Sequence, residues 1–296
     1  MSGAQATSGS GLIVVNDFGI GFGHGAQMVE AVSNLSLQVQ PGEFVSLIGP
    51  SGCGKSTVLN ALAGFIKPSR GSVVVDGAAI NGPGADRGMV FQQYSLFPWK
   101  TVRENVEFGL KMQGIGATER REAARTLLGL AGVLAFEDHY PDQLSGGMKQ
   151  RVGIVRALAT QPRVLLLDEP FGALDAQTRA IMQTILLNLW EGCKISVLFV
   201  THDIDEAIYL SDRIYVMTAR PGRIKAEMVV GLERPRHPEV TADPKFLALR
   251  RELMALIREE SLRAMGNEIS PSPPQSASRM ARDIADAVRP TVSSEP

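Results

Sequence analysis

The segment from Gly49 to Thr57 carries the residue types that bind a phosphate chain. It matches the pattern G-x-x-x-x-G-K-S/T, following an apolar run at residues 44–48 and opening a helical run at residues 56–63. Glycines let backbone N–H groups converge on a triphosphate, and Lys-Ser-Thr in register argues against a bare glycine turn. Lys55 would reach the β- and γ-phosphates, and Ser56 would place its hydroxyl on Mg²⁺. We predict a nucleotide-binding loop made of Gly49, Pro50, Ser51, Gly52, Cys53, Gly54, Lys55, Ser56 and Thr57.

Two adjacent carboxylates, Asp168 and Glu169, follow the continuous apolar run at residues 164–167. The carboxyl ends of buried strands are where open α/β sheets bind ligands. Asp168 would hold Mg²⁺ through water, and Glu169 would polarise the attacking water as a general base. The alternative is a pair of turn carboxylates that cap the next segment. The glycine loop favours the catalytic interpretation.

Two further polar residues follow predicted strands. His202 comes after the run at residues 195–200, and Gln92 comes after Met89-Val90-Phe91. A lone histidine at a strand end more often packs or caps, but its place on a third strand of the same sheet favours a γ-phosphate contact. The neutral amide of Gln92 can touch both Mg²⁺ and the attacking water, although glutamine alone would be unremarkable there.

A second anion-binding turn, Ser145-Gly146-Gly147, lies within residues 144–151. Ser145 can cap the helix that begins there, and the glycines leave backbone N–H groups uncovered. The turn lies in a helical stretch, residues 102–159, without a convincing strand, which we interpret as an insertion between two strands of the sheet. An insertion that projects from the sheet would not reach the phosphates held by Lys55 of its own chain. We therefore predict a head-to-tail dimer with ATP between the subunits.

The remaining elements predict an α/β fold. Short apolar runs at residues 73–75 and 214–217, the latter as the last strand, alternate with helical patterns at residues 176–191 and 204–210. Strand alternating with helix favours a sheet with helices on both faces. A chain of 296 residues has room for such a main domain with a subdomain.

The carboxyl-terminal part changes character after Gly231. Prolines punctuate a linker, and residues 245–265 form a charged amphipathic pattern that favours a helix docked on the main domain over one that binds a partner. Residues 266–296 are rich in serine and proline, and residues 1–11 are small and polar, without the features of a secretory signal; both predict flexible tails. The apolar face of the predicted helix comprises Phe246, Leu249, Leu253, Leu256 and Ile257.

Composition restricts the function classes. The 30 basic and 31 acidic residues give a net charge of −1, which favours neither nucleic acid nor anionic lipid. The two cysteines are Cys53, inside the glycine loop, and Cys193, so we expect no disulfide and a reducing cytoplasm. No apolar run approaches the ~20 residues of a membrane-spanning helix. We expect a soluble chain that meets a membrane only through a partner.

The order of these motifs resembles the ATP-binding-cassette ATPases over about residues 12–230. The resemblance implies ATP and Mg²⁺ as cofactors and a P-loop NTPase (RecA-like) core at residues 12–92 and 160–230, with an amino-terminal antiparallel β region. It also implies an inserted helical signature subdomain at residues 93–159; the linker and helix predicted at 231–265 lie beyond the matching stretch. In this family an aromatic residue stacks on adenine, which would be Phe22, with Phe18 as the rival. Asp175 of Ala173-Leu174-Asp175 would lie at the dimer seam and help align Glu169.

Residues 91–99 look like the importer branch of that family and are most similar to ATPases for nitrate, sulfonate and taurine uptake. The resemblance implies an ATPase at the cytoplasmic face of the inner membrane, with a second ATPase subunit, transmembrane permease subunits and, indirectly, a solute-binding protein as partners. Phe97 and Trp99 would contact the permease. Met148 stands where glutamine is usual. The alternatives are an exporter-type ATPase and a non-transport cassette protein that acts on DNA or ribosomes.

Overall fold

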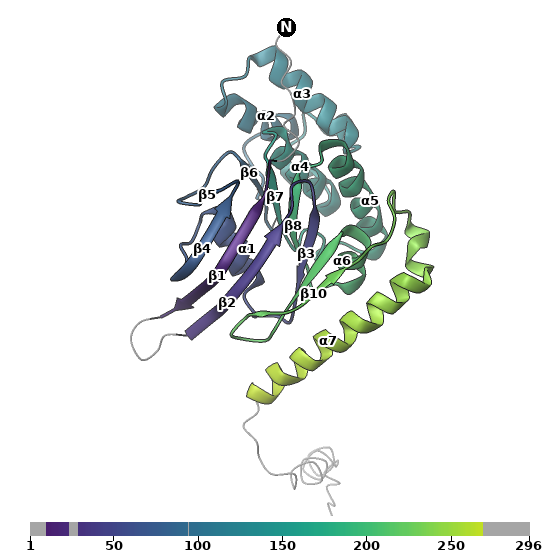
Figure 1. Ribbon diagram of the computed structural model, residues 1–296. Helices are drawn as coiled ribbons and strands as arrows, with labels where there is room; N and C mark the ends of the chain where they lie inside the picture. The colour runs from purple at the N-terminus through teal and green to yellow at the C-terminus, as the bar shows by residue number, and fades with distance from the viewer. Residues whose placement is uncertain (1–9, 24–28, 94, 269–296) are drawn as a thin grey trace, which may run out of the picture.

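The computed structural model describes residues 10–23, 29–93 and 95–268. Its centre is a six-stranded sheet in the order β10-β9-β3-β8-β7-β6, parallel except for the antiparallel edge strand β10 (Figure 1). Residues 214–217 were predicted as the last strand, which is wrong because β10 follows. The sheet consists of β3 (Phe44–Ile48), β6 (Arg87–Val90), β7 (Val164–Asp168), β8 (Ser196–Val200), β9 (Arg213–Met217) and β10 (Ile224–Val229).

An antiparallel sheet near the amino terminus covers one side of the molecule, as predicted. Its strand order is β2-β1-β4-β5, so the run at residues 73–75 belongs to this sheet and not to the parallel one. Helix α1 (Lys55–Ala63) packs between the two sheets through Val58, Leu59 and Leu62, which are fully buried. The strands are β1 (Ile13–Phe22), β2 (Val29–Val39), β4 (Arg70–Val75) and β5 (Ala78–Ala79).

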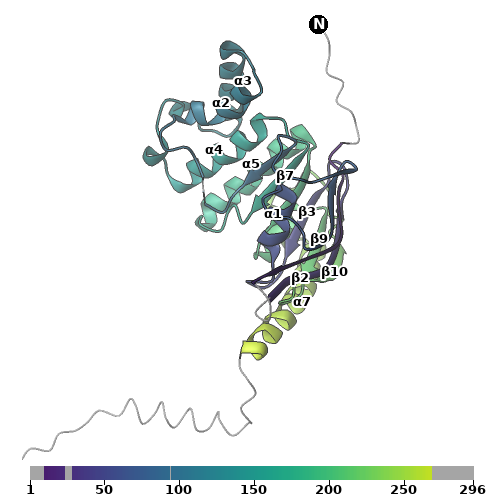
Figure 2. The same cartoon turned by 90° about the vertical axis from the view of Figure 1, so that its left-hand side faces the viewer.

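Only helices lie between β6 and β7 in the described part of the chain. Figure 2 shows them projecting on the side of the molecule away from the antiparallel sheet. A capping box at Thr101 and Glu104 begins the first of them, and Ser145 caps the last. They are α2 (Val102–Met112), α3 (Ala117–Leu130) and α4 (Gly146–Ala159), with short 3₁₀ turns η2 (Leu134–Phe136) and η3 (Pro141–Gln143).

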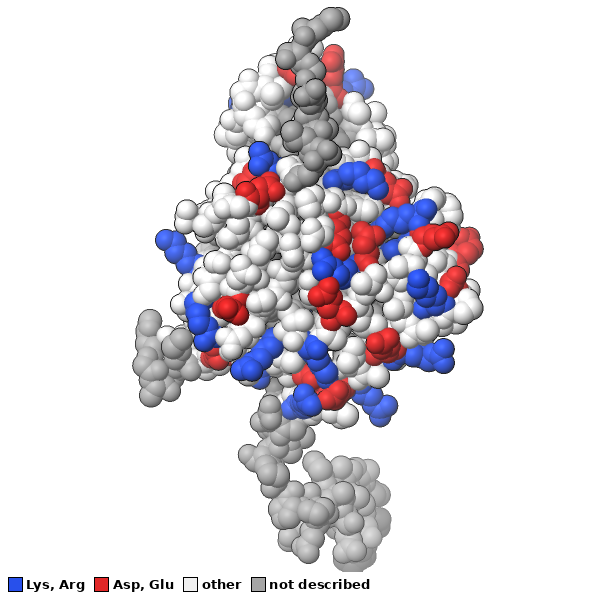
Figure 3. All heavy atoms as spheres, in the orientation of Figure 1, with Lys and Arg blue, Asp and Glu red and all other residues white. Residues whose placement is uncertain are grey.

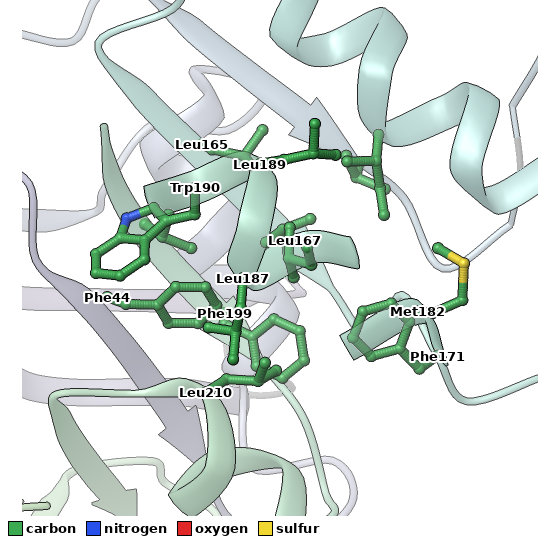
Figure 4. Close-up of a cluster of buried hydrophobic side chains, with 14 of the residues drawn as sticks. Phe44, Leu165, Leu167, Phe171, Met182, Leu187, Leu189, Trp190, Phe199 and Leu210 are labelled. Carbon is green, nitrogen blue, oxygen red and sulfur yellow. The ribbon is translucent and has the colours of Figure 1, made fainter. Parts of the chain in front are cut away.

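A second core fills the space between the parallel sheet and helices α5 (Ala176–Cys193) and α6 (Ile204–Leu210) (Figure 4). The ring of Phe44 meets the edge of Trp190 at 5.6 Å between centroids and lies 5.9 Å from Phe199. Phe171 packs on Phe199 at 5.8 Å and is fully buried. Because Phe171 lies only three residues after Asp168, this contact anchors the loop that follows β7.

The carboxyl-terminal helix α7 (Pro244–Glu268) is docked on the main domain, against α6 and β9 (Figure 1). Phe246 and Leu253 are buried, and Leu249, Leu256 and Ile257 pack against the core. The predicted docked helix is therefore confirmed.

The segment that precedes α7 is anchored to the carboxyl end of α6. The buried guanidinium of Arg236 donates to the carbonyl oxygens of Ile208 (3.1 Å), Tyr209 (2.9 Å) and Ser211 (2.7 Å). Burial, with Arg234 nearby, lowers the pKa of Arg236 to about 10. The carbonyls of a helix end are good partners for a cation that has lost its water. A short 3₁₀ turn, η4 (Pro238–Ala242), completes the link.

The two predicted tails lie mostly outside the described residues. Within them, Gly11 is fixed, since its N–H donates to Asp76 Oδ1 at 2.7 Å, and residues 266–268 continue α7, so these parts are not tail. Cys53 and Cys193 are free thiols, as expected. Among the described helices, none is long and apolar enough to cross a membrane.

Candidate active site

The glycine loop joins the end of β3 to the start of α1. Gly52 and Gly54 have φ values of 74° and 101°, a conformation that favours glycine. A Cβ on Gly54 would lie 2.4 Å from Val32 Cγ2, so the loop packs directly on β2. Gly54 is also the N-cap of α1 and offers no side chain to its first turn. The backbone N–H groups of that turn therefore remain open to an anion.

The ammonium of Lys55 is bonded to the first residues of this loop. Lys55 Nζ donates to the carbonyl oxygens of Gly49 at 2.8 Å and Pro50 at 3.1 Å, and the residue is buried. Burial raises the pKa of the Cys53 thiol, although the nearby Lys55 charge lowers it in part. A buried thiol with a raised pKa stays protonated and is a poor nucleophile, so Cys53 serves to pack the loop.

A pocket of about 320 Å³ opens beside the loop, within the size range of small-molecule sites. Phe22 stands at its edge with 51% of its surface exposed, whereas Phe18 is fully buried in the core. Of the two aromatic candidates, only Phe22 faces the pocket. The lining residues are Phe22, Val29, Ala31, Ser51, Gly52, Gly54, Lys55, Ser56, Thr57, Glu169 and Arg220.

Ser56 and Asp168 meet beneath the loop, where Ser56 Oγ donates to Asp168 Oδ1 at 3.0 Å. Burial raises the pKa of Asp168, and the charge of Glu169 adds to this rise, while Ser56 and Lys55 oppose it in part. The site therefore holds a carboxylate whose negative charge is incompletely compensated. Hydroxyl and carboxylate oxygens are the donors that Mg²⁺ prefers, so this pair fits the ion.

Glu169 is the centre of a second cluster. Its Oε2 lies 3.0 Å from His202 Nδ1 and accepts a weaker bond from Gln92 Nε2 at 3.5 Å. The three residues follow strands β7, β8 and β6, whose carboxyl ends meet at one edge of the sheet. Glu169 has a φ of 43°, which non-glycine residues adopt at a cost. The sheet thus brings together the polar residues predicted after separate strands.

Ser145, Gly146 and Gly147 are placed elsewhere. They form the start of α4, where Ser145 Oγ accepts from Met148 N at 3.4 Å, and none of them lines the pocket. A Cβ on Gly147 would lie 2.7 Å from Thr178 Cγ2, in the first turn of α5. Asp175 caps that helix by accepting from Thr178 N at 3.0 Å. The predicted second anion-binding turn and Asp175 therefore share a surface distinct from the pocket of the same chain.

Arg220 is the pocket residue that sequence reasoning missed, along with the apolar Val29 and Ala31. A signal for it existed. Arg220-Pro221-Gly222 follows β9, a strand parallel to β3, and so lies at the same carboxyl edge as the glycine loop. Its distance along the sequence from Gly52 concealed the contact.

The strand–loop–helix junction, the Ser56–Asp168 pair and the carboxylate held by His202 and Gln92 define a P-loop nucleoside triphosphatase. Comparison with known proteins identifies the family within this class. The family model described as "ABC transporter" matches residues 32–172. The chain belongs to the ATP-binding proteins of the ABC transporter family, which are ATP hydrolases coupled to transport.

Relatives with import names cover most of the chain. The nitrate import ATP-binding protein NrtD of Synechocystis sp. is 48% identical over 78% of this chain and 89% of the relative. The taurine import ATP-binding protein TauB of Yersinia pestis is 44% identical over 78% and 92%. An uncharacterized ABC transporter ATP-binding protein of Methanocaldococcus jannaschii is 51% identical over 80% and 88%.

Solved structures agree with the fold. A dimeric ATP-binding cassette in a post-hydrolysis state, bound to ADP and Pi, superposes with a TM-score of 0.67 at 35% identity and covers 75% of this chain and 100% of its own. The cbiO1 protein of Clostridium perfringens, part of the ABC transporter complex cbiONQ, has a TM-score of 0.68 at 26% identity and covers 86% and 99%. Both are cassette ATPases, which confirms the predicted fold class.

Proposed function

We propose that this chain is the motor subunit of an importer that takes up a small anion such as nitrate, a sulfonate or taurine. The import names of relatives at 44–48% identity support the direction of transport and the solute class. A solute-binding protein would deliver the anion to membrane-spanning permease subunits. The ATPase would sit at the cytoplasmic face of the inner membrane, bound to those subunits.

The separation of Ser145–Gly147 from the pocket carries the dimer part of the proposal. The pocket supplies the phosphate loop and Glu169, whereas the open helix start at Ser145 lies on the α4–α5 surface. A second cassette placed head to tail would bring its Ser145, Gly146 and Gly147 over the nucleotide. Asp175 would then lie at the seam. ATP bridges the subunits in this arrangement, and hydrolysis releases them.

Within each site we assign the roles from the positions of the residues. Phe22 stacks on adenine, and the loop residues with Lys55 bind the phosphates. Glu169 polarises the attacking water. His202 and Gln92 hold the carboxylate of Glu169 and approach the γ-phosphate. Ser56, Asp168 and Gln92 would hold Mg²⁺, which neutralises phosphate charge when bound.

The loop before α2 is suited to meet a permease. Trp99 is 71% exposed and packs near Phe97 at 5.7 Å, so an apolar ring is presented to the surface. Asn105 fixes the loop, since Asn105 Nδ2 donates to the carbonyl oxygens of Phe97 and Lys100 at 3.2 and 3.1 Å. Apolar side chains held on a rigid loop form good anchors for a partner helix.

Glu169→Gln tests the proposal, because the amide cannot accept a proton but keeps the shape. We expect ATP-dependent dimers in size-exclusion chromatography, hydrolysis reduced ~10²–10⁴-fold, and no anion uptake when the variant is co-expressed with a cognate permease. Glu233→Gln, an exposed carboxylate outside the pocket, is the control and should behave as wild type. Sustained turnover by the Glu169 variant would reject Glu169 as the base, and monomers at saturating ATP would reject the dimer.

A further inference from the structure

The turn between β9 and β10, residues 218–223, closes one side of the nucleotide pocket. Arg220 lines the pocket, is exposed, and its Nη2 donates to the carbonyl oxygen of Gly52 at 3.2 Å. This contact places the guanidinium directly on the phosphate-binding loop. We call residues 218–223 the Arg220 turn.

Backbone contacts hold the Arg220 turn against the loop. Gly222 N donates to Ala31 O at 2.9 Å, and Ser33 N donates to Gly222 O at 3.0 Å, so the turn is bonded to β2. A Cβ on Gly222 would lie 2.0 Å from the carbonyl oxygen of Cys53. Only glycine permits so close an approach. The turn is therefore packed on the loop that binds the phosphates.

Helix α7 holds the Arg220 turn through a side chain that bonds to its backbone. The carboxylate of Glu260 is 1% exposed and accepts from Ala219 N at 3.0 Å, directly before Arg220. It also accepts from Lys225 Nζ at 2.7 Å and Arg263 Nη1 at 3.0 Å. A buried carboxylate with three donors is held in one place, and so is the backbone bonded to it.

The charged residues of the pocket indicate that Arg220 can bind an anion. Its lining residues include two cations, Lys55 and Arg220, and one carboxylate, Glu169. Lys55 serves the β- and γ-phosphates. Among the described residues the Arg220 side chain donates only to Gly52 O, so its other N–H groups are available. Guanidinium groups bind phosphate oxygens through several N–H groups at once, more strongly than neutral donors do.

We propose that Arg220 binds the phosphate chain of the nucleotide and that Glu260 positions it, which links α7 to the ATP site. The inference deepens the nucleotide-binding part of the function above and is independent of the solute. Arg220 touches the substrate, whereas Glu260 acts through the backbone of Ala219.

Equilibrium binding of ATP, ADP and adenosine to the full chain tests the role of Arg220. Arg220→Ala should weaken ATP and ADP binding ~10-fold or more, while adenosine binding stays unchanged, because a charge-assisted bond is lost. Arg220→Lys should recover part of the loss. Arg223→Ala is the matched control: this exposed arginine belongs to the same turn but does not line the pocket. If Arg220→Ala binds ATP as Arg223→Ala does, the proposal is wrong.

A double-mutant cycle tests the positioning role. Glu260→Gln should weaken ATP binding ~3-fold in the wild-type chain but not further in the Arg220→Ala background, since the two act as a unit. Additive losses would reject the link to α7, because a general loss of stability would add in both backgrounds. Lys55→Ala distinguishes a wrong assignment of the nucleotide pocket from a wrong role for Arg220. If it too binds ATP normally, the assignment of the pocket fails, and not the role of Arg220 alone.

Discussion

At the scale of single residues, Asp168 carries a charge that the folded protein disfavours. Burial raises its pKa, which means that the folded protein disfavours the ionised carboxylate. Such a group destabilises the fold at any pH above its folded-state pKa, and the penalty disappears below the ordinary aspartate range. A bound cation would remove that penalty by compensating the charge.

Asp168→Asn should therefore raise the free energy of unfolding of the nucleotide-free protein at neutral pH. The gain should vanish as the pH falls below ~4, where the unfolded wild-type residue is also protonated. The same variant should lose the Mg²⁺-dependent part of its thermal stabilisation by ATP. Urea unfolding at pH 7.5 and pH 4 measures the first effect, with Asp142→Asn, an exposed turn carboxylate, as the control. A loss of stability at neutral pH would contradict this account.

The polar residues of the site were predictable to different degrees. Ser56, Asp168 and His202 follow or open strands and helices with strong local patterns, so their meeting at one sheet edge follows from the parallel order. Phe22 and Phe18 are equivalent by local pattern, and only packing separates them, because Phe18 turns into the core. Arg220 follows β9, which indicates its sheet edge, but its contact with Gly52 depends on the tertiary fold.

At the scale of elements, α7 depends on a narrow apolar contact. Leu253 is fully buried, whereas its neighbour Met254 is 53% exposed. Leu253→Ala should lower the free energy of unfolding by about 2–5 kcal/mol, because a buried leucine leaves a cavity when it is truncated. Met254→Ala should change it by less than about 0.5 kcal/mol. Chemical denaturation of both variants measures the difference, and equal effects would mean that α7 does not pack as described.

The same scale shows where sequence patterns succeed. Strand β3 and helix α6 have the predicted bounds, since a mostly apolar run, interrupted only by Ser46, and an Asp203 cap mark them locally. Strand β10 escaped prediction because it is an edge strand whose apolar residues are interrupted by Lys225 and Glu227, although it pairs with its sequence neighbour β9. The linker was predicted from its prolines, but its anchor, Arg236, depends on meeting the end of α6.

At the scale of the whole molecule, no single charge sign dominates the face seen in Figure 3, where Lys, Arg, Asp and Glu are interspersed. With a net charge of −1, long-range electrostatics contribute little to self-association. The proposed dimer would therefore be specified by local contacts, among them the shared nucleotide.

Mixing two inactive variants should restore hydrolysis if the site is shared between chains. Lys55→Ala removes the lysine proposed to bind the phosphates, and Ser145→Arg would block the start of α4. A heterodimer of the two keeps one intact composite site, so an equimolar mixture should regain about a quarter of wild-type turnover. Ser145→Arg alone should still bind ATP as a monomer. A mixture as inactive as its components, at concentrations where wild type dimerises, would contradict a shared site.

The left-handed backbone of Glu169 has a consequence for how such a chain evolves. A side chain in that conformation costs roughly 1–3 kcal/mol, and glycine or asparagine would relieve the strain. With Glu169 as the proposed base, the substitutions that best stabilise this position would also abolish hydrolysis. A duplicated copy no longer needed for transport would be expected to acquire these substitutions early. It would become more stable and would bind ATP without hydrolysing it. If Glu169 is the base, as proposed, the chain accepts a strained backbone at this position in exchange for turnover.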